Sequence, residues 1–441
     1  MVKLSQFLRL VTSRRILVIG DLVLDKYTYG KTERVSPEAP VLVLHVRREE
    51  VLPGGAGNVA LNLQALGAEV TVVGRVGEDR EAEELIVQLR ALGCNSFWLP
   101  AQKKWPTPVK NRLIAANQQM VRVDYEEIAP LSSDLEEIFV RELPLLIDQA
   151  DAVAISDYGK GFLTDRILHT IFASANKKAI PVVTDPKGAD FKKYRGTSMI
   201  KPNLKEAYAA SKLPLSALMQ DVAAKLLQET EARGLMITRG EEGISLFFPN
   251  GEQRDFPVEE KQVKDVTGAG DTVLAVLTFV LANGLSESLA ADWCNVAAGI
   301  AIERVGCARV SLSDLSLRLL EKNQAHKLFD QEHLFVLQRI LPAHPCCLLA
   351  LAAHSQLDVA LFQEIRRLAQ EKQTLLLYLL GETPPSSFVD MLLSLHEVHF
   401  VVVGKEGRFP ASSLAELERF LGCRPVQALL WQEGRATPLL G

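Results

Sequence analysis

The sequence is poor in the features that mark several classes of protein. Its 441 residues include six cysteines, and none of them form a Cys-x-x-Cys pair. Sparse, unpaired cysteines argue against a disulfide scaffold and a zinc site, and they favour a reducing compartment. No apolar run approaches the length that spans a membrane. These absences predict a cytoplasmic protein without a membrane partner.

An excess of positive charge is also missing. Lysine and arginine total 49 against 54 aspartate and glutamate residues, which gives a net charge of -5. General nucleic-acid binders normally carry a basic excess, so the composition argues against that class. A phosphorylated small molecule needs only a local basic pocket and stays compatible with mild acidity. At the N-terminus, residues 4–11 have helical spacing with interrupting arginines, which predicts a short amphipathic helix rather than a signal peptide.

The order of apolar segments predicts an α/β fold. Residues 15–20, RILVIG, form an apolar run that ends before Asp21, typical of a buried strand whose carboxyl end meets a site. Strands and helices then alternate to about residue 300, which predicts a mainly parallel sheet flanked by helices. Residues 26–50 and 110–126 alternate between polar and apolar positions. These two segments are expected to form a small β lid outside the main sheet.

A second, smaller domain is expected after a polar linker. The stretch 323–333 is polar, and apolar runs at 346–352, 374–380 and 398–403 alternate with helical segments. This pattern predicts a Rossmann-like α/β domain at residues 334–441, behind a first domain at residues 1–322.

The strongest motif is DVTGAGD at residues 265–271, followed by an apolar helix. Gly268 and Gly270 allow a tight turn and a close backbone approach to a ligand. The N–H groups and dipole of the helix start favour an anion such as a phosphate. Asp271, in the first turn, can accept the proton of an attacking hydroxyl. A capped helix start without function is the alternative, and the specificity of the run favours function.

Two further segments suit a sugar site. PGGAGNVA at residues 53–60 contains Gly54, Gly55 and Asn58, where a glycine turn enters a helix. Asp21, at the end of the first strand, can accept hydrogen bonds from sugar hydroxyls. A flexible turn and an ordinary turn aspartate are the alternatives for these two features.

Two other segments suit a nucleotide. In KPNLKEA, residues 201–207, Asn203 and Glu206 are three apart and share one face of a helix start. They suit a water-bridged Mg²⁺, and equally a capping box without a ligand. ITRGEEG, residues 237–243, is typical of a strand and turn beside a nucleotide, or of a plain hairpin turn.

Taken in this order, the segments over residues 14–320 resemble the ribokinase-like (PfkB) carbohydrate kinases. Longer stretches resemble the heptose 7-phosphate kinases of lipopolysaccharide core synthesis. Those stretches are GDLVLDKYTYGKTERVSPEAPV, PGGAGNVALNLQALGA, SDYGKG, DPKGADFKKYRG and KPNLKEA.

The resemblance implies phosphorylation of D-glycero-D-manno-heptose 7-phosphate at its anomeric hydroxyl, with ATP and Mg²⁺. It implies that Asp271 is the catalytic base and that Glu206 holds the metal through water. The implied anion hole consists of Gly268, Ala269 and Gly270. The implied nucleotide-binding residues are Asn203, Glu206, Thr238, Gly240, Gly243 and Asn295. The implied sugar-binding residues are Asp21, Gly54, Gly55 and Asn58.

Basic residues on the expected lid bear on the acceptor. Lid cations are usually solvated, but Lys110, Arg112 and Arg122 suit a substrate that already carries a phosphate. Further candidates for substrate contacts are Asn117 and Gln118, with Lys160 and Lys187 for phosphate. The lid strands also suit pairing between two copies, and the resemblance suggests a homodimer.

The second domain departs from the pattern of the related bifunctional proteins. Many relatives carry an adenylyltransferase with an HxGH motif after the first strand of that domain. In this sequence His354 is followed by Ser355, Gln356 and Leu357. Residues 334–441 are therefore expected to be a degenerate nucleotidyltransferase-like domain without that activity. A docking or dimerisation role and an unrelated α/β module are the alternatives.

Two other functions stay open for the first domain. One is a ribokinase-type kinase for another sugar or sugar phosphate. The other is a non-catalytic protein that binds a metabolite. The intact Asp271 and its glycines argue against the second, since a protein without catalysis is free to lose its base.

Overall fold

The structure is a computed structural model. It describes residues 11–94, 96–116, 118–258, 265–304, 306, 309–321, 327–330, 337–338, 341, 345–352, 356–369, 373–380, 385–404, 413–432 and 434–439. Two compact units divide the chain between Ser311 and Leu312. α10 (Leu312–Glu321) belongs to the second of these units, whereas the sequence analysis placed it in the first domain; the boundary at residue 322 stays a prediction. The polar composition marks the residues after this helix but not the helix itself.

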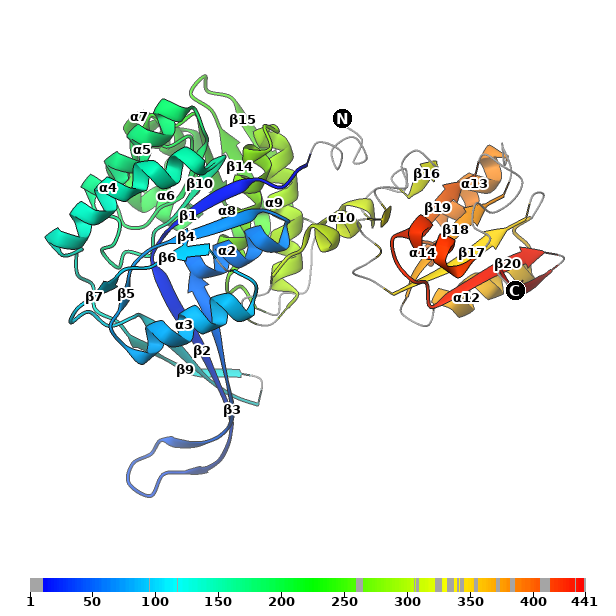
Figure 1. Cartoon of the computed structure of the whole chain (residues 1–441), viewed down its shortest axis with the longest axis horizontal. Coiled ribbons are helices and arrows are strands. Elements are labelled where there is room, and N and C mark those ends of the chain that lie inside the picture. Colours follow the sequence, from blue (N-terminus) through cyan, green and yellow to red (C-terminus); the bar gives the residue numbers. More distant parts are fainter. Residues whose placement is uncertain are drawn as a thin grey trace. The chain divides into compact units, whose positions relative to one another are not determined.

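The first unit is built on a nine-stranded sheet in the order β15-β14-β13-β12-β11-β10-β1-β4-β6 (Figure 1). The strands from β6 to β13 pair in parallel, and β14 and β15 continue the sheet in antiparallel pairing. Their bounds are β1 Arg15–Gly20, β4 Glu69–Val73, β6 Ser96–Trp98, β10 Ala152–Ser156, β11 Val182–Asp185, β12 Met199–Ile200, β13 Gly234–Thr238, β14 Ile244–Phe247 and β15 Gln253–Phe256. A separate short pair joins β5 Val76–Gly77 to β7 Ala101–Gln102. The expected α/β fold with a mainly parallel sheet is confirmed.

Helices cover both faces of this sheet, which explains why β1 is one continuous apolar run. On one face, α2, α8 and α9 pack together and against β1, β10, β11 and β14 (Figure 1). On the other face, Leu17 and Ile19 of β1 join a core with Phe139, Ile167 and Val222 from α4, α5 and α7. The bounds are α2 Ala56–Ala65, α3 Arg80–Ala91, α4 Ser133–Gln149, α5 Asp165–Lys178, α6 Leu204–Ser211, α7 Met219–Thr230, α8 Ala269–Ala282 and α9 Glu287–Ile302, with short turns η1 Lys192–Tyr194 and η2 Gly240–Glu242.

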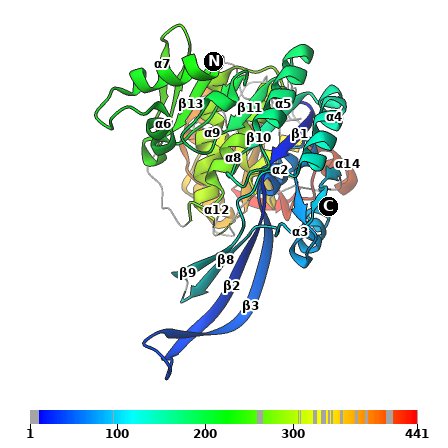
Figure 2. The same ribbon diagram turned by 90° about the vertical axis from the view of Figure 1, so that its left-hand side faces the viewer.

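A four-stranded lid extends from the first unit, as Figure 2 shows. Its order is β3-β2-β8-β9, with β2 Leu22–Val35, β3 Leu42–Gly55, β8 Val109–Ala115 and β9 Gln118–Tyr125. The pairing of β2 with β8 places Asp25 opposite Lys110 and Tyr27 opposite Arg112. The expected lid strands are therefore confirmed, and they carry two of the predicted cations to the end of β1.

The second unit has a six-stranded sheet in the order β16-β19-β18-β17-β20-β21, parallel except for β21. The strands are β16 Leu328–Asp330, β17 Cys346–Leu351, β18 Thr374–Leu379, β19 Phe400–Val403, β20 Gln427–Gln432 and β21 Arg435–Pro438. Its further helices are α12 Val359–Ala369, α13 Ser386–Ser394 and α14 Leu414–Leu421. The prediction that 323–333 is only a linker is wrong at β16. Polar neighbours hid its short apolar core, in which Phe329 is buried against β19.

Two expectations concern residues that lie outside the described part of the chain. Residues 4–10 of the expected N-terminal helix lie outside it, and so do His354 and Ser355. Within the described part of the chain, none of the helices combines the length and the apolarity needed to cross a bilayer.

Charged residues gather where the parallel strands end, because their carboxyl ends share one edge of the sheet. Asp21 follows β1, Asp157 follows β10, Asp185 ends β11, and Lys201 follows β12. The Lys201 side chain is buried, and its Nζ lies 2.9 Å from Oδ2 of Asp185. Burial raises the pKa of Asp185 to about 6, and the Lys201 ammonium opposes this rise.

We expect Lys201→Met to destabilise the first unit in a pH-dependent way. Without the ammonium, ionised Asp185 is left with a buried charge, so the free energy of unfolding should fall by about 3 kcal/mol near pH 8. Loss of Lys201 raises the folded-state pKa of Asp185 further. An acid whose pKa is higher in the folded than in the unfolded state lowers the free energy of unfolding when the pH is above its unfolded-state pKa. This loss of stability becomes smaller as the pH falls toward the unfolded-state pKa.

Urea unfolding at about pH 5 and about pH 8 measures this difference. Lys205→Met, at an exposed position in α6, is the matched control and should change little at either pH. An equal deficit for Lys201→Met at both pH values would contradict the assignment to Asp185.

Candidate active site

The start of α8 is held open by its own turn. Gly268, the residue before the helix, has a φ of 78°, and no side chain caps the helix start. Asp265 fixes the turn, because its carboxylate accepts hydrogen bonds from the N–H groups of Thr267 and Gly306, both at 2.9 Å. The positive end of the helix is therefore available to an anion, as the motif predicted.

Asp271 lies in the first turn of this helix and is only 4% exposed. Its Oδ2 accepts a hydrogen bond of 2.8 Å from Nδ2 of Asn58 in α2. Its Oδ1 accepts a hydrogen bond of 2.7 Å from the hydroxyl of Tyr158, which follows β10. Both carboxylate oxygens are thus held by donors from other parts of the fold.

Burial sets the protonation of this carboxyl group. It raises the pKa of Asp271 to about 7, while the hydrogen bonds from Asn58 and Tyr158 act in the opposite direction. Asp185 adds to the rise and Lys201 opposes it. A carboxylate with a pKa near neutrality is well matched to accepting and releasing a proton at physiological pH.

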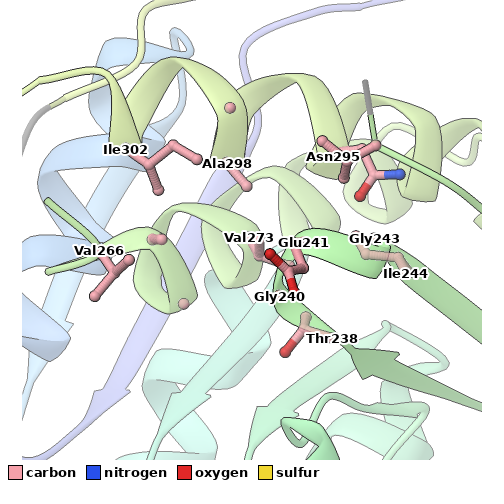
Figure 3. A pocket seen from close by; sticks show the side chains of 14 residues that line it. Thr238, Gly240, Glu241, Gly243, Ile244, Val266, Val273, Asn295, Ala298 and Ile302 are labelled. Carbon is pink, nitrogen blue, oxygen red and sulfur yellow. The ribbon is translucent and has the colours of Figure 1, made fainter. Parts of the chain in front are cut away.

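A cavity of about 520 Å³ lies on one side of the α8 start (Figure 3). Of the predicted nucleotide and anion-hole residues, six line this cavity: Thr238, Gly240, Gly243, Ala269, Gly270 and Asn295. The buried ammonium of Lys201 is also near, since a Cβ built on Gly270 would lie 3.9 Å from its Nζ. The size, glycine-rich rim and adjacent helix start suit a nucleotide.

The apolar wall of this cavity was not predicted from the sequence. In Figure 3, Asn295, Ala298 and Ile302 lie along α9 and Val266 lies at the entrance to α8. Asn295, Ala298 and Ile302 are spaced by three and four residues, so they share one helix face. That spacing from the predicted Asn295 was a usable signal. An apolar wall of this kind suits the face of a flat ring.

Asn203 and Glu206 form a capping box, which was one of the two alternatives that the sequence predicted for them. Asn203 Oδ1 accepts from the Glu206 N–H at 2.9 Å, and Glu206 Oε2 accepts from the Asn203 N–H at 3.1 Å. Glu206 Oε1 also accepts from Nζ of Lys187 at 2.8 Å. Asn203 pairs with Thr238 in an isolated bridge, so this helix start lies next to the cavity without lining it.

A small polar cavity of about 50 Å³ lies on the other side of the α8 start. The residues around it are Val23, Asp25, Gly55, Lys110, Arg112, Tyr158, Thr267, Gly268 and Asp271. Gly268 and Asp271 therefore face this cavity, whereas Ala269 and Gly270 between them face the larger one. Successive residues of one helix start join the two sites.

The predicted lid cations separate into two groups. Lys110 and Arg112 reach the small cavity, where Arg112 forms a buried ion pair with Asp25. Burial and the nearby Lys160 lower the pKa of Lys110. Lys160 is itself buried and pairs with Glu126 at 2.6 Å.

The remaining lid residues are more open. Gln118 and Arg122 are exposed on β9, with Arg122 bound to Asp124 through two hydrogen bonds of 2.8 Å. Asn117 lies outside the described residues. The structure therefore brings two of the predicted lid residues to the cavity wall. Arg122 lies opposite Arg112 and Gln118 opposite Ala115 on the neighbouring strand β9, and neither of them lines the cavity.

The glycines at the end of β3 allow close packing at the cavity floor. A Cβ on Gly54 would come within 2.1 Å of Oδ2 of Asp25, and Gly55 has a φ of 56°. Asp21 lies below this floor, 2% exposed and outside the cavity wall. Tyr158, which the sequence analysis did not single out, lines the cavity instead.

Comparisons with known proteins place the chain among close relatives. It is 43% identical over 333 residues to the bifunctional protein HldE of Trichlorobacter lovleyi, which covers 75% of this chain and 67% of that relative. It is 46% identical over 301 residues to the bifunctional protein HldE of Geobacter metallireducens, covering 68% and 61%. The matches thus span about two thirds of the length of these relatives or less.

Solved structures agree on the fold. Arabidopsis thaliana ribokinase, complexed with ribose and ATP, superposes with a TM-score of 0.55 at 19% identity, over 70% of this chain and 99% of that one. Escherichia coli phosphofructokinase-2, in complex with fructose-6-phosphate, gives a TM-score of 0.55 at 19% identity, over 69% and 97%. At such identities the likeness concerns the ribokinase-like fold. Residues 13–314 match the pfkB family carbohydrate kinase, and the chain therefore belongs to that family.

Proposed function

We propose that the first unit transfers the γ-phosphoryl group of ATP to the anomeric hydroxyl of D-glycero-D-manno-heptose 7-phosphate. One observation carries the proposal: the start of α8 lies between a nucleotide-sized cavity and a small cavity that contains cations, with Asp271 facing the second. The resemblance of several long segments to heptose 7-phosphate kinases supports this choice of acceptor. The product would be the 1,7-bisphosphate.

The geometry suits direct transfer between the two cavities. Ionised Asp271 accepts the proton of the anomeric hydroxyl, and the oxygen attacks the γ-phosphorus as the bond to ADP breaks. The amides at the start of α8, with the helix dipole, stabilise the charge on the moving phosphoryl group. Because the Asp271 carboxylate is buried, water is kept away from it, which disfavours hydrolysis of ATP.

The residues present fit Mg²⁺ held through water. Each oxygen of Glu206 already accepts one hydrogen bond, from Lys187 or from the Asn203 N–H. Such a carboxylate retains lone pairs for a bound water, and Mg²⁺ usually keeps several waters and takes its other ligands from substrate phosphates. When bound there, the metal would neutralise phosphate charge.

The acceptor cavity supports a phosphorylated sugar. Lys110 and Arg112 lie in its wall, and Lys160 is close enough to lower the pKa of Lys110. Arg112 and Lys160 have carboxylate partners in Asp25 and Glu126, so Lys110 is the wall cation best suited to pair with an anionic group on the substrate.

We expect Asp271→Asn to lower the rate of ADP release with heptose 7-phosphate by roughly 1,000-fold, because the amide cannot accept the proton. The assay compares heptose 7-phosphate with fructose 6-phosphate, ribose and buffer. Asp148→Asn, at an exposed position in α4, is the matched control and should keep full activity.

Three outcomes of this assay separate the alternatives. Full turnover by Asp271→Asn would overturn the assignment of the base. Preference for an unphosphorylated sugar would favour a kinase with another acceptor. No ADP release by the wild-type protein with any acceptor would favour a non-catalytic binding role.

Lys110→Gln should weaken acceptor binding selectively. Loss of one charged contact to the acceptor phosphate predicts a KM for heptose 7-phosphate that rises roughly 10-fold, with little change in the KM for ATP. Steady-state kinetics with each substrate varied in turn measure both values. Lys103→Gln, at an exposed position after β7, is the control. An unchanged KM for the sugar phosphate would place its phosphate elsewhere.

We also infer that residues 334–441 do not load the sugar 1-phosphate onto AMP. After the buried strand β17, the chain continues to Gln356 and Leu357 where the HxGH pattern requires glycine and histidine. Two histidines at that position hold nucleotide phosphates in such domains. The measurement is pyrophosphate release from ATP and Mg²⁺ with heptose 1-phosphate, and none above the buffer control is expected. Pyrophosphate formation with a 1:1 yield of the nucleotide sugar would contradict this inference.

A further inference from the structure

Tyr158 contacts the carboxylate on which the proposed reaction depends, from the loop that follows β10. Its hydroxyl donates to Oδ1 of Asp271 at 2.7 Å, and its ring lines the acceptor cavity. We propose that Tyr158 is a positioning residue for Asp271, and that Asp21 beneath the cavity positions Tyr158. This inference rests on the proposed function, because it concerns the group assigned there as base.

The carboxylate needs an external support. Asp271 belongs to the first turn of α8, where its side chain can rotate unless it is held. Asn58 holds Oδ2 from α2, and Tyr158 holds Oδ1 from the β10–α5 loop. Two donors from separate elements fix the plane of the carboxylate, and small errors in the direction of a base are costly to the rate.

The Tyr158 loop is held in turn by buried carboxylates. Oδ2 of Asp21 accepts hydrogen bonds from the N–H groups of Tyr158 at 2.9 Å and Lys160 at 3.0 Å. Oδ1 of Asp157 accepts from the N–H of Gly159 at 2.7 Å. Three consecutive amides of the loop are therefore bound to side chains that end the neighbouring strands β1 and β10.

Asp21 suits this role better than a contact to the sugar. It is 2% exposed and does not belong to the cavity wall, and both hydrogen bonds that its side chain accepts within the described structure come from the loop amides. Burial and the nearby Asp157 raise the pKa of Asp21 to about 6. Burying a carboxylate costs folding free energy. The presence of Asp21 at this buried position is explained if the conformation of the loop depends on it.

Tyr158 also influences the proton affinity of Asp271. A hydrogen bond to the ionised carboxylate favours that form and lowers its pKa, against the effect of burial. Burial and the charge of Asp271 raise the pKa of Tyr158 well above its ordinary value, so the hydroxyl keeps its proton and stays a donor at neutral pH.

Several charged groups surround this contact and stay unchanged when Tyr158 is altered. Asp185 and Lys201 act on Asp271 from the ends of β11 and β12. From the lid, Asp25, Lys110 and Arg112 share the cavity wall with Tyr158. Lys110 Nζ also lies 5.2 Å from the centre of the Tyr158 ring. A change confined to the hydroxyl therefore reports on its own bond to Asp271.

The test is the pH dependence of kcat/KM for heptose 7-phosphate in Tyr158→Phe. In the wild-type protein the base acts when ionised, so activity should fall as the pH drops through about 7. Loss of the donor should raise the pKa of Asp271. The fall of kcat/KM on the acid side of the pH profile, its acid limb, should therefore occur about one pH unit higher. The KM for ATP should stay unchanged. Tyr208→Phe, in α6, loses a hydroxyl hydrogen bond to the Ala217 carbonyl; it is the matched control and should leave the limb in place.

The link to Asp21 is tested by combining variants. Asp21→Ala removes the acceptor for both loop amides, so it should shift the acid limb in the same direction as Tyr158→Phe. The double variant Asp21→Ala with Tyr158→Phe should be no worse than the more impaired single variant, since both act through one contact. Asp21→Asn keeps an acceptor oxygen and should retain more activity than Asp21→Ala.

The outcomes separate this inference from the proposed function. A wild-type protein without turnover, or an active Asp271→Asn variant, would defeat the proposed function itself. An active wild type, an inactive Asp271→Asn and a Tyr158→Phe limb that coincides with the wild type would overturn the role of Tyr158. Additive effects in the double variant would overturn the role of Asp21. If Asp21→Ala does not fold, the double variant Asp21→Asn with Tyr158→Phe replaces it, and a limb shifted beyond that of Tyr158→Phe alone would overturn the role of Asp21.

Discussion

Burial of the Asp271 carboxylate at the start of α8 is the constraint on which the rest of the site depends. Removed from water, the group must find its hydrogen-bond donors within the protein, and it finds them in Asn58 and Tyr158. Those donors come from α2 and from the loop after β10, so the sheet and both helices must be assembled before the carboxylate is satisfied. The same burial brings its pKa close to neutrality, where a base for a sugar hydroxyl is useful.

The topology of the sheet explains why the charged residues meet in one place. Parallel strands direct Asp21, Asp157, Asp185 and Lys201 to a single edge. The α8 start lies over this edge and divides the space above it into two cavities. In the lid, β2 follows β1 and pairs with β8, which adds Lys110 and Arg112 to the smaller one. Membership of the pfkB family indicates a carbohydrate kinase, and in the proposed function this division gives each substrate its own cavity.

The sequence predicted those parts of the fold and site that depend on neighbours along the chain. The β1 run, the lid strands and the glycine turn before Asp271 are local patterns, and the structure contains each of them. Contacts between distant segments were beyond such patterns: Asn58 and Asp271 are 213 residues apart, and Tyr158 is 113 residues from Asp271. The strand β16 was missed because its apolar core is too short to stand out between polar neighbours. The role proposed for Asp21 depends on hydrogen bonds from the N–H groups of Tyr158 and Lys160, which no side-chain pattern reveals.

Phosphorus-31 NMR of the reaction mixture tests the central claim most directly. It follows ATP, ADP, inorganic phosphate and the sugar phosphate together, with wild-type protein and Asp271→Asn in parallel. The account predicts a new sugar phosphate resonance that grows in 1:1 proportion to ADP in the wild type, and its absence in the variant. ADP accompanied only by inorganic phosphate, or the same new resonance at the same rate in both proteins, would contradict Asp271 as the base of a transfer between the two cavities.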